Sequence, residues 1–103
     1  MDANWWKAWA PKLSAYAILI RLLIDQRISA REFEALFLQL YQDDPTDWPV
    51  NVLDVLESLF ADVDEFSTAQ AARPASTERV EHLLRSRASE AFTRLSELAP
   101  AIG

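Results

Sequence analysis

Apolar residues recur along this chain with the spacing of helix faces. In the first such segment, residues 12–26, an apolar residue occupies every third or fourth position, which is the i, i+3, i+4, i+7 rule of one helix face. That face consists of Leu13, Tyr16, Ala17, Ile20, Leu23 and Ile24. Because Ile18, Leu19 and Leu22 make the opposite side apolar too, we expect this helix to be the most buried one.

A second helix is predicted over residues 29–42. Ser29 followed by Glu32 is a capping box, in which each side chain bonds the other residue's free backbone N–H. The apolar stripe behind the cap consists of Phe33, Leu36, Phe37, Leu40 and Tyr41. Residues 43–49 then read DDPTDWP, and the two prolines end the helix because proline cannot continue a helix interior.

The third predicted helix, residues 50–66, has the sharpest division between an apolar and a charged face. Its apolar residues fall within an arc of roughly 160° on the helical wheel. They are Val52, Leu53, Val55, Leu56, Leu59, Phe60, Val63 and Phe66. The opposing arc is acidic, and its acids are Asp54, Glu57, Asp62, Asp64 and Glu65.

A loop and a fourth helix complete the pattern. Residues 67–75 are mostly small and polar, which is typical of a loop, and Ser76 or Thr77 can cap a helix over residues 77–98. The core face of that helix consists of Val80, Leu83, Leu84, Ala88, Ala91, Phe92, Leu95 and Leu98. Four amphipathic helices with short connections predict an all-α, single-domain antiparallel four-helix bundle over residues 1–103, with residues 1–11 as a tryptophan-rich N-terminal extension.

Composition narrows the fold and the location. The one glycine, at position 103, cannot supply the tight turns of a sheet protein. The chain has no cysteine, so it has neither a disulfide nor a thiolate metal site. The most apolar run, residues 15–24, has half of the roughly 20 residues that are needed to span a bilayer. Three tryptophans precede this run and no small-residue cleavage site follows it, so the N-terminus does not resemble a signal peptide. We therefore expect a cytoplasmic protein without a membrane segment.

The net charge of −6 comes entirely from the middle third of the chain. Residues 41–72 contain eight acids and no base. No lysine or arginine lies at i+4 to pair the acids of the third helix, and Asp64 and Glu65 lie near its C-terminal end, where the helix dipole disfavours negative charge. A helix face that carries only negative charge costs stability, which favours a binding site for a basic protein surface over an ordinary solvent-exposed helix face. The same negative charge repels phosphate groups and so disfavours direct nucleic-acid binding.

Candidate catalytic and metal-binding groups are few. The only histidine, His82, lies on the polar side of the fourth helix, where a surface role is more typical than acid–base catalysis. A calcium loop beginning at Asp62 fails, because Ser67 and Arg73 stand where a glycine and a bidentate acid are needed. The chain also lacks a glycine-rich phosphate loop and a Glu-x-x-His motif. We expect no enzymatic activity, no metal and no cofactor.

The tryptophans leave two alternatives open. Trp5, Trp6 and Trp9 either close the open end of the bundle or form an exposed aromatic patch for a homodimer or another partner. Trp48, between Asp47 and Pro49, is expected to cover the core, with a role as a partner anchor as the alternative.

Several short motifs point to one family. Ile28-Ser29-Ala30 with Glu32-Phe33, then Tyr41, then Leu56-x-x-Leu59-Phe60-x-Asp62-x-Asp64, resembles the colicin D immunity protein-like family over roughly residues 13–95. These are small bacterial self-protection proteins encoded beside nuclease toxins. The resemblance implies a four-helix bundle that binds the toxin's catalytic domain and blocks its basic, RNA-binding cleft with an acidic surface that mimics the phosphate backbone. The tryptophan-rich N-terminus looks unlike the family.

Together, the pattern and the resemblance predict an immunity protein that neutralises a cognate nuclease toxin, with tRNA-cleaving toxins as the favoured class. The predicted toxin-binding acids are Asp54, Glu57, Asp62, Asp64 and Glu65. Asp43, Asp44, Asp47 and Trp48 are predicted to extend this surface. The alternative is an acidic helical adaptor or regulatory module that binds another basic or helical protein.

Overall fold

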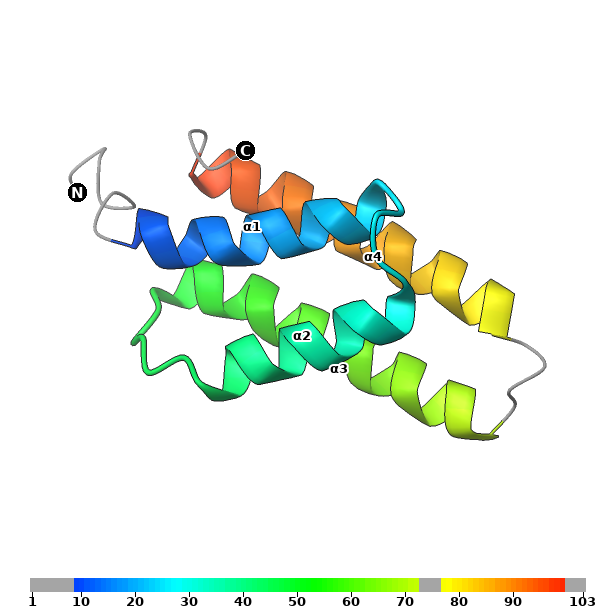
Figure 1. The fold of residues 1–103 in the computed structure, drawn as a ribbon. Coiled ribbons are helices and arrows are strands. Elements are labelled where there is room, and N and C mark those ends of the chain that lie inside the picture. The colour runs from blue at the N-terminus through cyan, green and yellow to red at the C-terminus, as the bar shows by residue number, and fades with distance from the viewer. Residues whose placement is uncertain (1–8, 73–76, 100–103) are drawn as a thin grey trace.

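The structure, a computed structural model, describes residues 9–72 and 77–99, and within them it consists of four α-helices. The helices are α1 (Ala10–Ile24), α2 (Ala30–Gln42), α3 (Val50–Ala72) and α4 (Thr77–Leu98). Successive helices run in opposite directions along the bundle (Figure 1). The predicted all-α antiparallel four-helix bundle is therefore confirmed.

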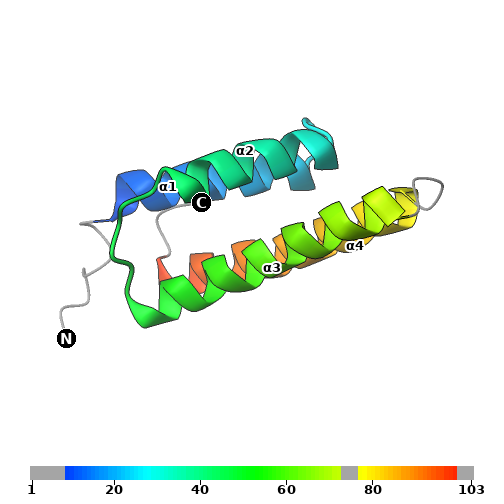
Figure 2. The same ribbon diagram turned by 90° about the horizontal axis from the view of Figure 1, so that it is seen from below.

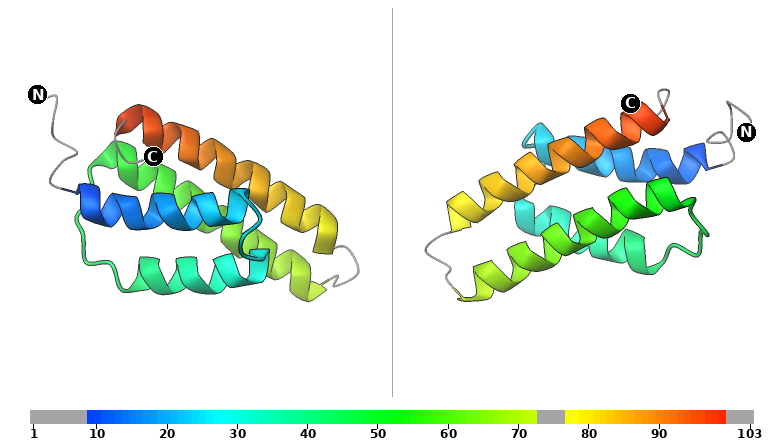
Figure 3. Two further views of the ribbon diagram at one scale, coloured as in Figure 1. Left: turned by 45° about the horizontal axis from the view of Figure 1, so that its top comes forward. Right: turned by 180° about the vertical axis from the view of Figure 1, so that it is seen from behind.

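The helices form two layers, α1 with α2 and α3 with α4, as Figure 2 shows. The most extensive helix–helix contact joins α3 to α4, and the next joins α1 to α4. Because α3 and α4 are the two longest helices, their far ends extend beyond the layer of α1 and α2 (Figure 3). The layer of α1 and α2 consequently does not cover these ends of the α3–α4 hairpin.

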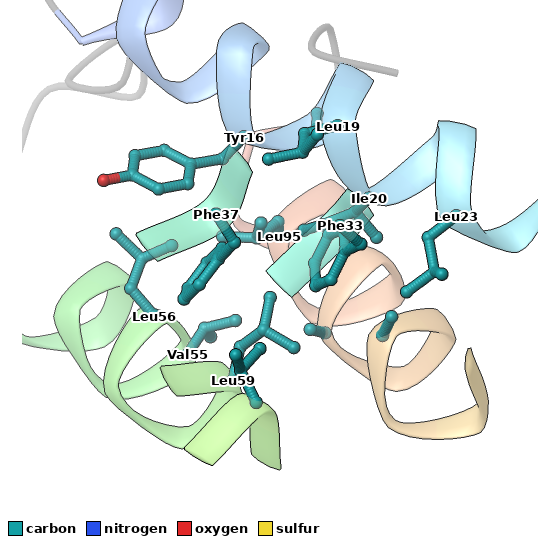
Figure 4. Packing of buried hydrophobic residues seen from close by; sticks show 14 of the residues in the cluster. Tyr16, Leu19, Ile20, Leu23, Phe33, Phe37, Val55, Leu56, Leu59 and Leu95 are labelled. Atoms are coloured by element: carbon teal, nitrogen blue, oxygen red, sulfur yellow. The ribbon is translucent and has the colours of Figure 1, made fainter. Parts of the chain in front are cut away.

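The hydrophobic core lies between the two layers. Tyr16 and Leu23 of α1 meet Phe33 and Phe37 of α2 above the apolar sides of α3 and α4 (Figure 4). The rings of Phe33 and Phe37 stack with their centroids 5.6 Å apart, and Tyr16 meets Phe37 edge-on at 6.1 Å. Fully burying one large apolar side chain contributes about 1.5–3 kcal/mol, so this cluster is the main source of stability.

Local sequence features set both ends of α2 and the start of α3 as predicted, whereas α1 begins and ends two residues earlier than the predicted 12–26, so that Ala10 and Pro11 of the predicted extension belong to the helix. The Ser29 side chain accepts a hydrogen bond from the Glu32 backbone N–H at 3.1 Å, and the Ser29 N–H donates to Glu32 Oε1 at 2.9 Å, which completes the capping box. The linker after α2 is non-helical, and α3 begins directly after Pro49. Between α1 and α2, Gln26 takes a left-handed φ of 59°, a conformation that usually requires glycine.

The predicted end of the third helix was wrong. The helix continues from the expected end at residue 66 through Ala72, and so includes most of the predicted loop. The segment STAQAA contains neither glycine nor proline, and three of its six residues are alanine, the strongest helix former. Small, polar composition alone does not end a helix when no residue opposes helical backbone angles.

Four residues assigned to apolar helix faces are exposed rather than buried: Ile18 is 61% exposed, Leu36 48%, Leu83 45% and Phe60 37%. In a two-layer bundle a helix is covered on the side that faces its neighbours. An apolar arc wider than that contact leaves its outer members in water. Even so, α1 buries six of its 15 residues, a larger share than α2, α3 or the described side chains of α4, as expected for the most buried helix.

Candidate protein-binding surface

Four of the predicted contact acids lie exposed along α3. Asp54, Glu57, Asp64 and Glu65 all point away from the core, and we call them the acidic strip. Asp54 and Glu65 are eleven residues apart, which corresponds to about 16 Å along a helix. The carboxylates therefore form an elongated band of negative charge, open to a partner along its length.

Asp62 lies differently from the acidic strip, because it is half-buried at the seam between α3 and α4. Burial is the largest influence on its carboxyl group and raises the pKa. Arg87 opposes this, while Glu65 and Glu90 raise the pKa further, so that the net direction is upward. Asp62 is thus an edge residue whose charge is partly balanced from α4.

Basic side chains of α4 border the acidic strip on that side. Arg79 and Arg87 line a pocket of about 190 Å³ together with Asp62 and Glu65. The apolar part of this pocket consists of Phe66, Ala69, Val80, Leu83 and Leu84. All charged residues of α3 are acidic, but the neighbouring charges across the α3–α4 seam include arginines. The sequence search for a base four positions after each acid covered α3 alone, and therefore could not find the arginines of α4.

Asp44 has a structural environment that the sequence did not indicate. Its Oδ2 accepts hydrogen bonds from the Tyr16 hydroxyl and from Trp48 Nε1, each at 2.8 Å, and its Oδ1 accepts one from the Thr46 N–H at 3.0 Å. Burial by itself would raise the pKa of Asp44, but the hydrogen bonds from Thr46, Trp48 and Tyr16 outweigh it and hold the pKa below its usual value. Burial and the Asp44 carboxylate raise the pKa of Tyr16, which therefore stays a proton donor. Asp44 fastens the α2–α3 linker to α1.

Trp48 belongs to the same arrangement. It is 8% exposed, lies in the hydrophobic core, and meets the Tyr16 ring edge-on at a centroid distance of 6.2 Å. This is the core-covering position that the sequence favoured. Asp43 and Asp47, by contrast, are exposed, and the Asp43 carboxylate accepts a hydrogen bond from Gln39 Nε2. Of the four linker residues predicted to extend the binding surface, these two present charge to water.

Phe60 is an exposed aromatic side chain beside the acidic strip, where the sequence had placed a core residue. Glu57 precedes it by three positions and Asp64 follows it by four, so both acids lie one helical turn away on the same side. The position of Phe60 at the margin of the apolar arc, next to these acids, was the one feature of the sequence that could have indicated exposure.

The remaining candidates offer little chemistry. His82 is exposed on α4, and residues 62–72 are helical, so they do not form a calcium loop. Within residues 9–72 and 77–99 no three metal-ligating side chains gather, and no helix there is long and apolar enough to cross a membrane. Trp9 packs partly buried against the core, whereas Trp5, Trp6 and the candidate cap Ser76 lie outside the described residues.

The fold and this surface define a small all-α domain with an exposed acidic face on one helix. Comparison with protein families gives the particular family: the model of bacterial self-protective colicin-like immunity proteins matches residues 12–95. Because the match covers most of the chain, this protein belongs to that family. No curated protein and no solved structure matches the chain significantly.

Proposed function

We propose that this protein neutralises a nuclease toxin by laying the acidic strip of α3 over the toxin's basic active-site cleft. The observation that carries the proposal is an exposed, single-sign helix face in a member of a colicin-like immunity family. A nuclease must attract phosphate groups, so its cleft is basic, and a row of carboxylates offers that cleft the same kind of charge as its substrate. We favour a tRNA-cleaving toxin as the target and the bacterial cytoplasm as the place of binding.

The proposed mechanism has two stages. The negative field of residues 41–72, which contain eight acids and no base, first steers the basic toxin into the correct orientation. Asp54, Glu57, Asp64 and Glu65 then pair with lysine, arginine or histidine side chains in the cleft and exclude the RNA. The protein acts by occlusion and uses no catalytic group.

The other predicted contact residues take different parts in this proposal. Asp62 marks the edge of the contact at the α4 seam, while Asp43 and Asp47 extend the negative charge beyond α3. Asp44 and Trp48 contribute indirectly, because they hold the linker that precedes α3.

The test compares two variants that remove equal charge from different places. The first changes Glu57→Gln, Asp64→Asn and Glu65→Gln on the acidic strip. The control changes Glu78→Gln, Glu81→Gln and Glu97→Gln on α4. The probe is the catalytic domain of the nuclease toxin encoded beside this chain. Binding is measured by calorimetry and inhibition by an RNA-cleavage assay.

We expect the strip variant to raise Kd by about 100-fold, because it loses three close charge pairs of roughly 1 kcal/mol each. The control variant should change Kd by less than about threefold, since surface charges outside the contact contribute little. Equal weakening by the two variants would mean that net charge, and not the acidic strip, governs binding. No inhibition by the unaltered protein would instead favour the adaptor alternative.

A further inference from the structure

Phe60 combines partial exposure with a position next to two acids of the acidic strip. More than a third of its surface is exposed, at 37%, and it is absent from the buried cluster between the layers. On α3, the exposed acids Glu57 and Asp64 lie about one turn before it and one turn after it. The ring therefore lies between two carboxylates on the face that we propose to contact the toxin.

The ring is also held in place from behind. Its centroid lies 5.0 Å from that of Tyr41 on α2, with the ring planes tilted by 32°. Tyr41 stacks on Phe37 at 5.8 Å, and Phe37 on Phe33 at 5.6 Å, so a row of rings leads from the surface into the core. An aromatic side chain fixed in this way loses little conformational entropy on binding, which is a property of the residues that dominate interface energetics.

Ile18 shows what an incidental exposed side chain looks like on this molecule. It is 61% exposed on α1, and the neighbours one turn away on that helix are neutral or basic: Ser14, Ala15, Arg21 and Leu22. Single exposed aliphatic residues are normal on protein surfaces. Phe60 differs in its aromatic backing and in its two flanking acids.

We propose that Phe60, backed by Tyr41, is the anchor of the toxin-binding surface and receives an arginine side chain of the toxin. This rests on the proposed function. A guanidinium group that lies on the Phe60 ring keeps its N–H groups free at its edge, where the carboxylates of Glu57 and Asp64 accept them. Arginine suits the site better than lysine because its planar group stacks on a ring and donates several hydrogen bonds at once.

The negative charge of Glu57 and Asp64 favours an arginine over the other possible partners of Phe60. A second copy of this chain that docked through the same face, as in a two-fold dimer, would bring its own Glu57 and Asp64 against these acids. A purely apolar side chain would use the ring and leave both carboxylates partly desolvated without a partner, which is unfavourable. A cation with a flat apolar face satisfies the ring and the acids together.

The experiment measures Kd for the toxin's catalytic domain with Phe60→Ala, Phe60→Leu and the control Ile18→Ala. Phe60→Leu keeps an apolar side chain of similar size but removes the π face. We expect Phe60→Ala to raise Kd by about 30-fold, Phe60→Leu by at least about fivefold, and Ile18→Ala by less than twofold. Thermal unfolding is used to check that each variant is folded. We expect all three to fold, because Phe60 and Ile18 are exposed.

A double-mutant cycle then locates the arginine. Each arginine of the toxin's catalytic domain is changed to alanine and combined with Phe60→Ala. One arginine should show a coupling with Phe60 that the other arginines lack.

The outcomes separate the two proposals. If Phe60→Ala binds as tightly as the unaltered protein while the strip variant binds weakly, the anchor is wrong and the proposed function stands. If Phe60→Leu binds normally and Phe60→Ala does not, the occupant is an apolar side chain and the arginine is overturned. If neither the unaltered protein nor any variant binds the toxin domain, the proposed function fails, and the anchor fails with it.

Discussion

Asp44 accepts hydrogen bonds from three residues on two segments: Tyr16 on α1, and Thr46 and Trp48 in the linker. Glu57, thirteen positions later, is exposed on α3. In sequence the two acids look alike, since both belong to the stretch without a base. Their surroundings differ, and so one carboxylate stabilises the fold while the other is available to a partner.

At the residue scale we predict that Asp44→Ala lowers the free energy of unfolding by about 2–3 kcal/mol at pH 7, because three donors lose their acceptor. Tyr16→Phe should cost about 1 kcal/mol, and the exposed control Asp47→Ala less than about 0.5 kcal/mol. Urea unfolding followed by tryptophan fluorescence measures all three. A loss with Asp44→Ala no larger than with Asp47→Ala would contradict the structural role of Asp44.

The same carboxylate predicts a dependence on pH. The pKa of Asp44 is lower in the folded protein than the usual value, so its contribution to stability is present above the unfolded pKa of about 4 and is lost as the pH falls through the folded pKa. The difference in stability between the unaltered protein and Asp44→Ala should therefore narrow as the pH is lowered from 7 to below 4. A constant difference over that range would show that the charged form of Asp44 is not what the three donors require.

At the scale of elements, α3 combines core residues and the proposed binding surface in one helix. Its buried residues, among them Leu59, Val63 and Phe66, hold the acidic strip on a rigid support. Its length matters as well. Because the helix continues to Ala72, Asp64 and Glu65 lie in its interior and not in its last turn, which reduces the unfavourable effect of the helix dipole on them.

The length of α3 can be tested with Ser67→Pro. If residues 67–72 are helical, proline removes a backbone hydrogen bond from the helix interior and should lower the free energy of unfolding by about 3 kcal/mol. Ser67→Ala is the matched control and should be neutral or stabilising by up to about 0.5 kcal/mol, because alanine is the better helix former. Chemical denaturation gives both values. If Ser67→Pro did not lower the free energy of unfolding, residues 67–72 would be a loop, as their composition suggested, and not part of α3.

At the scale of the whole molecule, acidic and basic residues that are far apart in the sequence lie close together in the folded protein. The middle third of the sequence carries the excess of acids, and the fold brings Arg79 and Arg87 of α4 beside Asp62 and Glu65. The acidic strip therefore keeps exposed carboxylates on α3, while Asp62 at the seam is partly balanced by arginines.

This arrangement predicts salt-dependent association with the toxin's catalytic domain. Between about 20 mM and 500 mM salt the association rate constant should fall by at least tenfold, because the Debye length falls from roughly 20 Å to about 4 Å. The dissociation rate constant should change much less, since close pairs within the contact are poorly screened. Stopped-flow fluorescence measures both rates. In the variant Glu57→Gln, Asp64→Asn, Glu65→Gln the association rate should depend on salt less steeply; an unchanged slope would place the steering charge elsewhere.

Much of this protein follows from local sequence features. The spacing of apolar residues predicts four helices, and Ser29 with Glu32 and the prolines of the linker predict where α2 begins and where it stops. These features act through neighbouring residues, by hydrogen bonds within one turn or by excluded backbone angles, and therefore need no tertiary contact to take effect. They determine the all-α class and the presence of an acidic face.

The tertiary structure decided which side chains of each face are covered. Leu59 and Phe60 are neighbours in one apolar arc, yet Leu59 is buried and Phe60 is exposed, because coverage depends on where the other layer ends. Asp62 and Asp64 belong to one acidic arc, yet Asp62 faces arginines of α4 and Asp64 faces water. Helical periodicity gives the direction of a side chain around its own axis, whereas its burial and its partners depend on contacts between residues far apart in sequence, which only the packed bundle brings together.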